Sequence, residues 1–330
     1  MRLRDPRTLH LAVVYLLPVV VALAGWGVGA AVAVAAAALA LGIAIRLFVS
    51  LRAMRRPPAP LRLHTITFSH YSEKVRWCLD RLGIEYVEAP NVGILGVLLT
   101  GRTVPWLEVP PGLTRIGDSP RILRYLWGEY AGRLPSERTW FLEPTPAALA
   151  LEEHFDRRLG NDVRVWVYPR IWCDRALTLR SWGLEERAIP AWQRALLASS
   201  VPVLRVAVRR MLGITPARTQ RALERTREAF DEVDRLLADG RRYLTGATLT
   251  FADLTFASLG ALAVLPPEYP GGKLGGRRLT LEDVQDPAWR AEIERFRARP
   301  SGQFILGLYR DERNARPRPP TPAEASERAG

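Results

Sequence analysis

The chain has 330 residues, a net charge of +13 and only two cysteines, Cys78 and Cys173. This length predicts one or two domains of ordinary size, and two distant cysteines exclude a disulfide framework. The four histidines are scattered without the paired spacing of a zinc site, so we expect no metal. Arginines are spread along the chain after residue 50, which argues against nucleic-acid binding and fits attraction to anionic lipid. Genomic base composition is the alternative explanation for the arginine excess.

Residues 9–45 contain no Asp, Glu, Lys or Arg. As one helix this run would measure about 55 Å, far more than the roughly 30 Å hydrocarbon core of a bilayer. A reversal at residues 25–29, where three glycines surround Trp26 and Val28, divides the run into two short spans. We therefore predict a transmembrane helical hairpin at residues 1–51.

The charges that flank this hairpin predict its orientation. Arginines precede the first span and follow the second, so the positive-inside rule places both ends in the cytoplasm. The predicted location is the cell membrane, with two helices crossing it and the globular part in the cytoplasm. The apolar run is too long for a signal peptide. A single tilted span and a buried soluble hairpin are the alternatives.

The pattern after the hairpin predicts an α/β domain. Residues 52–60 are basic and proline-rich, which is typical of a stiff linker. A β-rich stretch at 61–68 precedes helical spacing at 72–82 that Gly83 closes. A helix follows Asp118, with Ser119 as its N-cap. Between them we expect strands at 85–89 and 106–109, an apolar helix at 92–99 and a hairpin strand at 113–116.

Strand signals stop after Gly132, and helical patterns continue to about residue 309. We therefore predict an α/β domain at 61–130, a linker at 131–146, an all-helical domain at 147–310 and a disordered tail at 311–330. Within the helical domain, Thr250 and Asp253 predict a capping box at the start of a buried helix. The stretch 203–212 has arginines on one face and apolar residues on the other, as a helix on lipid or against another domain would have.

Four features occur in a set order: SHYSEKVRW at 69–77, the Val104-Pro105 pair, the Asp118-Ser119 pair and the Thr250 capping box. In this order and spacing, residues 61–309 resemble the glutathione S-transferase superfamily. The resemblance implies a thioredoxin-like α/β N-domain followed by an all-α helical-bundle C-domain. It also implies that the protein is a transferase. The membrane hairpin departs from the family's usual soluble members.

The resemblance places the catalytic residue at Ser69, with Ser72 as the second candidate. A free thiol has a pKa near 8.5, so an enzyme that uses one must stabilise the thiolate. A hydroxyl at a helix N-terminus can donate a hydrogen bond to it. Simple helix capping by these serines is the alternative. Tyr71 is another candidate donor, whereas we expect His70 in an exposed loop and Cys78 in an inert core.

The resemblance also assigns a binding site for glutathione, or for another low-molecular-weight thiol, as co-substrate. Thr103, Val104 and a cis Pro105 would contact its peptide backbone, and Asp118 and Ser119 its γ-glutamyl end. An apolar electrophile would bind between the domains, near Tyr71 and the aromatic residues Phe155, Trp166 and Tyr168. Packing in the core is the alternative role for these aromatic side chains.

The leading hypothesis is therefore a membrane-anchored transferase, either monomeric or homodimeric, that contacts lipid and conjugates a glutathione-like thiol. The alternative is a non-catalytic module with the same fold that binds a protein partner at the membrane.

Overall fold

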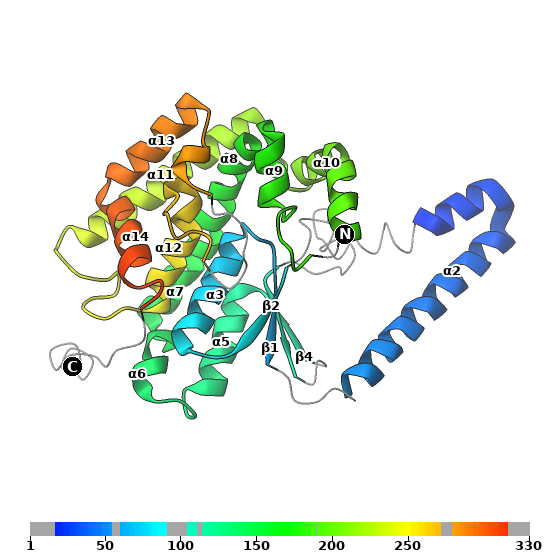
Figure 1. Ribbon diagram of the computed structural model, residues 1–330, viewed down its shortest axis with the longest axis horizontal. Coiled ribbons are helices and arrows are strands. Elements are labelled where there is room, and N and C mark those ends of the chain that lie inside the picture. Colours follow the sequence, from blue (N-terminus) through cyan, green and yellow to red (C-terminus); the bar gives the residue numbers. More distant parts are fainter. Residues whose placement is uncertain are drawn as a thin grey trace.

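The computed structural model describes residues 17–54, 60–90, 104–110, 114–189, 191–271 and 279–315. Figure 1 shows a long apolar helix, a small sheet with two helices against it, and a larger group of helices. We call the sheet with its two helices the α/β layer and the remaining helices of the globular part the helical layer. The predicted order of an α/β part before an all-helical part is confirmed.

The sheet has four strands in the order β2-β1-β3-β4. Strand β1 is parallel to β2 and antiparallel to β3, and β3 is antiparallel to β4. Alternate residues of β1 (Leu61, Leu63 and Thr65) are buried, as expected for a strand with one covered face. The bounds are β1 Leu61–Thr65, β2 Tyr86–Pro90, β3 Trp106–Val109 and β4 Thr114–Gly117.

Helix α3 (His70–Leu82) connects the two parallel strands and is central to the site. It begins two residues earlier than predicted because Ser69 is its N-cap, whose Oγ accepts the N–H of Ser72 at 3.2 Å. It ends at Gly83 (φ 64), as predicted, since glycine adopts the left-handed conformation without strain. The apolar side chains of Val75, Cys78, Leu79 and Leu82 are fully buried.

Helix α5 (Ser119–Tyr130) packs against α3. Its N-cap is Asp118 rather than the predicted Ser119, and Pro120 lies in the first turn. The helices that follow are α6 Ser136–Thr139, η2 Trp140–Leu142, α7 Pro146–Arg157, α8 Leu159–Cys173, α9 Arg175–Ser181, α10 Ala191–Met211, α11 Pro216–Leu237, α12 Phe251–Val264, η3 Leu281–Asp283, α13 Pro287–Ala298 and α14 Pro300–Asp311.

Helix α12 lies at the centre of the globular part, and every one of its residues is buried. The predicted capping interaction is present: Asp253 accepts hydrogen bonds from the N–H and hydroxyl of Thr250 at 2.7 and 2.9 Å. Its neighbours include α3, α7, α8 and α14. Because α12 contacts both α3 and the helical layer, one core holds the two layers together.

Helix α2 (Leu17–Met54) is apolar and bends at Gly27 (φ 84, ψ −177), within the predicted reversal (Figure 1). Within the described residues, one stretch is long and apolar enough to cross a membrane, Gly27–Ala44, with a mean hydropathy of 2.2. Only 6% of that stretch is buried. The structure thus supports one candidate span where the sequence predicted two. Residues 9–16, half of the predicted first span, lie outside the described residues.

Two further predictions need comment. The apolar helix expected at 92–99 lies outside the described residues. The tail was expected to be disordered from residue 311, but α14 continues to Asp311 and the side chain of Arg313 is buried against α3. The prediction was wrong for residues 311–313 because composition does not reveal a buried ion pair 240 residues away in the sequence.

Candidate active site

A cavity of about 710 Å³ lies between the α/β layer and helices α7 and α8. This volume is typical of pockets that enclose a small-molecule ligand. The α/β layer contributes Tyr71, Val104, Pro105, Asp118, Ser119, Pro120 and Arg124. The helical layer contributes Leu149, Glu152, Glu153, Asp156, Arg157 and Arg164.

Four of the five residues predicted to bind the thiol peptide meet at this cavity. Val104 and Pro105 enter it through a cis peptide bond, and Asp118 and Ser119 enter it at the start of α5. The N–H of Asp118 donates to the carbonyl of Pro105 at 3.3 Å, so the two segments are hydrogen-bonded to each other. The fifth residue, Thr103, lies outside the described residues.

The start of α5 has polar groups that are free to bind a ligand. Asp118 adopts φ 75 and ψ 129, which is strained for a residue with a side chain. Its carboxylate makes no capping bond and, among the described residues, no ion pair. The Ser119 hydroxyl is buried and has no hydrogen-bond partner in the described part of the chain. A helix N-terminus beside such groups favours a carboxylate, while the aspartate favours an ammonium.

Neither predicted catalytic serine is among the residues that line the cavity. Ser69 is 8% exposed, and its oxygen is occupied as the cap acceptor of α3. Ser72 is fully buried, and its hydroxyl has no partner within the described residues. Capping by Ser69, the alternative interpretation, is therefore present. It leaves the hydroxyl hydrogen of Ser69 able to donate, because the cap uses only the oxygen.

Of the three candidate thiolate donors, Ser69, Ser72 and Tyr71, it is Tyr71 that lines the cavity. Its hydroxyl donates to the carbonyl of Asp156 at 3.0 Å, and burial raises the pKa of the phenol above its ordinary value. A side chain at Gly160, the second residue of α8, would collide with this hydroxyl. A glycine there permits the close approach of α8 to Tyr71.

His70 is buried, not in an exposed loop as predicted. Its Nε2 lies 2.8 Å from the carbonyl oxygen of Gly160, which requires the tautomer that donates from this nitrogen. Burial, together with the nearby Arg164 charge, lowers the pKa of His70 to about 3. The prediction was wrong because His70 is the first residue of α3, and the helical layer, which is distant in sequence, covers it.

Charged residues connect the two walls of the cavity. The Lys74 ammonium, fully buried on α3, lies 2.7 Å from Glu152 Oε1 and 2.9 Å from Asp156 Oδ1. Arg124 of α5 pairs with the other oxygen of Glu152. Burial raises the pKa of Asp156, and the Lys74 charge opposes that rise. We call these four residues the cavity-side network.

Arg164 is a cavity-lining cation that the sequence analysis did not single out. Its guanidinium donates to Asn161 Oδ1 at 2.9 Å and, within the described residues, pairs with no carboxylate. Its charge is one of the influences that lower the pKa of His70, after burial, and it opposes the burial-driven rise of the Tyr71 pKa. No local motif marks one arginine among so many, so only the fold reveals it.

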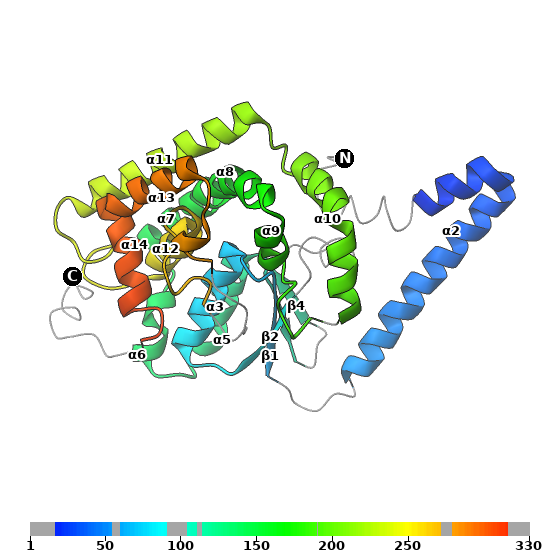
Figure 2. The same ribbon diagram turned by 45° about the horizontal axis from the view of Figure 1, so that its top comes forward.

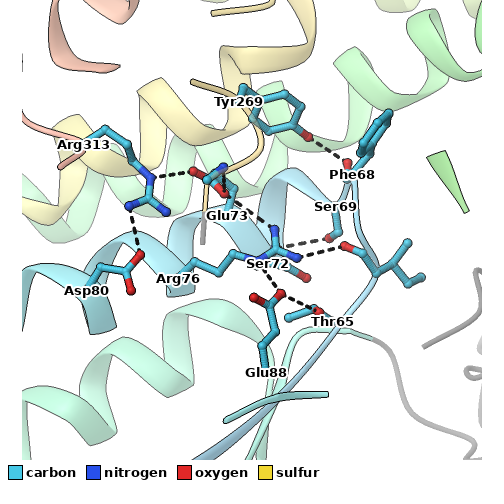
Figure 3. Close-up of polar contacts among 12 residues, drawn as sticks. Thr65, Phe68, Ser69, Ser72, Glu73, Arg76, Asp80, Glu88, Tyr269 and Arg313 are labelled. Atoms are coloured by element: carbon cyan, nitrogen blue, oxygen red, sulfur yellow. Dashed lines mark hydrogen bonds and ion pairs between the residues drawn. The ribbon is translucent and has the colours of Figure 1, made fainter. Parts of the chain in front are cut away.

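A second group of charges surrounds α3 away from the cavity (Figure 3). Glu73 Oε1 accepts from Arg313 Nε at 2.7 Å, and its Oε2 accepts the N–H of Gly271 at 3.0 Å. Arg76 donates to Glu88 at 2.6 Å and lies 3.5 Å from Glu73. Arg313 also donates to Asp80 at 2.9 Å. We call Glu73, Arg76, Asp80, Glu88 and Arg313 the buried network.

The aromatic residues predicted to bind the electrophile do not line the cavity. Phe155 is fully buried with its ring 5.1 Å from that of Phe256, and Trp166 packs on Phe296. Tyr168 packs against Trp172 with the rings tilted and their centres 5.5 Å apart. Phe155 and Trp166 belong to the core, and Tyr168 is partly buried and packs against it. The described wall of α7 and α8 is mostly charged, and Leu149 is its one apolar residue.

Cys78 is buried as predicted, and burial raises the pKa of its thiol to about 12, so it is unreactive as a nucleophile. In the part of the chain that the structure describes, no group of three or more His, Cys, Asp or Glu side chains is placed to hold a metal ion.

Comparison with known sequences identifies two domains in the expected order. The family described as "Glutathione S-transferase, N-terminal domain" matches residues 63–134. The family described as "Glutathione S-transferase, C-terminal domain" matches residues 216–302. A search of curated proteins gave no match.

Solved structures similar to this chain include two fungal glutathione transferases. One, from Phanerochaete chrysosporium, is 17% identical, with 77% of this chain and 97% of that chain covered and a TM-score of 0.49. The other, from Ceriporiopsis subvermispora in complex with glutathione, is 18% identical, with 76% and 97% covered and a TM-score of 0.48. The two family matches, in their order along the chain, identify a glutathione S-transferase N-terminal domain and a glutathione S-transferase C-terminal domain in this protein.

Proposed function

We propose that this protein is a membrane-anchored glutathione S-transferase that conjugates a glutathione-type thiol to an electrophile in the cavity. The observation that carries the proposal is the meeting of Val104, Asp118 and Ser119 at one cavity of suitable volume. The Asp118 carboxylate would bind the γ-glutamyl ammonium, and Ser119 with the start of α5 its carboxylate. The backbone of Val104 would pair with the peptide in the manner of an added strand.

The sulfur would lie near the start of α3, where four features can stabilise a thiolate. The N-terminus of α3 supplies a favourable dipole. Ser69 supplies a hydroxyl hydrogen, and Tyr71 supplies the hydroxyl of a cavity-lining side chain, whose hydrogen would have to leave the Asp156 carbonyl. Arg164 adds a positive charge that no carboxylate neutralises within the described residues. Ser69 stays our first candidate for the donor, Tyr71 is the competitor, and Ser72 is too deeply buried to be preferred.

Helix α2 supports the membrane part of the proposal. Its stretch Gly27–Ala44 is apolar and almost wholly exposed, as a span in lipid would be. An electrophile that partitions into the bilayer would then reach the enzyme at high local concentration. Because the helical wall of the cavity is mostly charged, we propose that this molecule has a polar group beside its apolar part.

The proposal is tested with the full-length protein in lipid nanodiscs. Saturable binding of glutathione is expected, and Asp118→Asn should weaken it roughly 10-fold or more, since it removes a charge-assisted contact. Glu153→Gln, which removes an exposed carboxylate at the same cavity, is the matched control and should bind normally. Absence of binding at millimolar glutathione would overturn the proposal.

The donor is identified by the pKa of the bound thiol, read from thiolate absorbance, and by the conjugation rate. Ser69→Ala should raise that pKa and slow conjugation. If Tyr71→Phe does so instead, Tyr71 is the donor.

The absence of both predicted serines from the cavity lining favours a second candidate, a non-catalytic module that binds a protein partner at the membrane. Glutathione binding without conjugation of any electrophile in a broad panel, together with a stoichiometric partner recovered from the membrane, would favour this candidate.

A further inference from the structure

Helix α10 presents exposed apolar side chains on one face. Outside α2, the structure describes four large apolar side chains that are exposed, and three of them lie on α10: Leu196 at 43%, Val203 at 71% and Val206 at 49%. They are spaced seven and three residues apart, so they share one face of the helix. The opposite face packs into the protein through Leu197, Val201, Leu204 and Val208. Soluble surfaces seldom concentrate exposed apolar residues in this way.

The charge on α10 indicates what this face contacts. The helix contains four arginines and no acidic residue. Arg209 and Arg210 are exposed at its C-terminal end, beside the apolar face. Apolar residues flanked by arginines are typical of helices that lie in the interface of an anionic bilayer.

The position of α10 agrees with such a contact. Six residues, 55–60, separate α2 from β1, and a chain of this length spans roughly 20 Å at most. The globular part is therefore close to any bilayer that α2 crosses. In both views α10 lies on the side of the globular part nearest α2 (Figures 1 and 2). The helix also lies between the two regions that match the family, at 63–134 and 216–302.

We infer that the exposed face of α10 binds the surface of an anionic bilayer, with Leu196, Val203 and Val206 entering the headgroup boundary and Arg209 and Arg210 contacting lipid phosphates. This inference rests on the membrane anchorage by α2 that forms part of the proposed function. The contact fixes the orientation of the globular part relative to the membrane.

The test uses the full-length protein with the exposed Cys173 changed to serine, in nanodiscs of neutral or anionic lipid. In three separate variants, one cysteine is introduced and labelled with an environment-sensitive fluorophore. The cysteine replaces Val203, Glu228 at an exposed position of α11, or Leu39 of α2. Nitroxide lipids then quench labels that touch the bilayer. We expect quenching at Val203 in anionic discs and none at Glu228. Replacing both Arg209 and Arg210 by glutamine should lower the equilibrium constant for binding of the α10 face to anionic lipid by about 30-fold.

Three results would overturn the inference. If Leu39 is quenched but Val203 behaves like Glu228, α2 is inserted and the α10 contact is wrong. If neither Leu39 nor Val203 is quenched, the anchorage and the α10 contact both fail, while glutathione binding is judged by its own titration. If Val203 is shielded only when two protein molecules share a disc, the face binds a second copy instead of lipid.

Discussion

The cavity-side network and the buried network use the same chemistry on two sides of one helix. Both pair basic residues of α3 with carboxylates, and Lys74 and Arg76 are each fully buried. The partners of Lys74 line a cavity that a ligand can enter, whereas Glu73 and Arg76 are enclosed by Arg313, Gly271 and the sheet (Figure 3). The comparison teaches that burial alone does not identify a functional charge. Access to an open volume separates the two networks.

The largest effect is expected from breaking the buried network with Glu73→Gln. The substitution removes the charge that faces Arg313 and Arg76, and leaving buried cations poorly compensated costs about 3 kcal/mol or more of unfolding free energy. Denaturant unfolding in nanodiscs measures the loss.

Asp311→Ala, which breaks an exposed pair with Arg310, is the control and should leave the unfolding midpoint unchanged. If Glu73→Gln does not fold, the partly exposed Asp80→Asn gives a smaller loss. Normal stability in both variants would contradict a structural role for the buried network.

Lys74→Met breaks the cavity-side network and should affect stability and binding together. Glu152 keeps Arg124 as a partner, so we expect a loss of only about 2 kcal/mol of unfolding free energy. The unpaired Asp156 would then repel an anionic thiol peptide, weakening glutathione binding about fivefold. Calorimetric titration beside unfolding separates the two effects. Unaltered glutathione affinity would show that this network, like the other, serves stability alone.

The dependence of the unfolding free energy on pH tests whether the His70 side chain is buried. Burial lowers the pKa of His70 from 6.5 to about 3, so protonation favours the unfolded chain. This contribution to stability is complete above pH 6.5 and is lost as the pH falls toward 3. His70→Gln keeps a donor for Gly160 and should flatten unfolding free energy against pH across this window. His64→Gln should flatten it similarly, since burial also lowers the pKa of His64 to about 3. An unchanged slope in His70→Gln would contradict the buried neutral ring.

The smallest expected effect concerns Arg164. Arg164→Gln should raise the pKa of the bound thiol by about one unit, because a nearby cation favours the thiolate. Arg164→Lys keeps the positive charge, so the pKa of the bound thiol should stay close to its value in the unchanged protein. Arg157→Gln is the matched control, since its guanidinium pairs with Glu153 at the surface. A thiol pKa that stays constant across these variants would remove Arg164 from the proposed chemistry.

Local sequence patterns predicted several elements well. The caps of α3 and α12 are visible in sequence because Gly83 and the Thr250-Asp253 pair act within one helical turn. The order of strand, helix and hairpin in the α/β layer was predicted from the spacing of apolar residues along short stretches of the chain. The residues of the thiol-peptide site were found through the family resemblance, and the fold brings four of them to one cavity.

Other features were missed because they depend on contacts between the layers. The sequence of α8 does not show that Tyr168 and Trp166 face the core, or that Gly160 makes room for Tyr71. The burial of His70 and of Arg313 was missed for the same reason.

The sequence by itself determined the apolar N-terminal helix, the order of α/β and helical parts, and the caps at Gly83 and Thr250, because these depend on residues close together in the chain. Only the tertiary structure decided which candidate thiolate donor lines the cavity, that Arg164 pairs with no carboxylate within the described residues, and which acids are enclosed. Those outcomes depend on how α7, α8 and the C-terminal segment pack on α3, and such packing joins residues up to 240 positions apart.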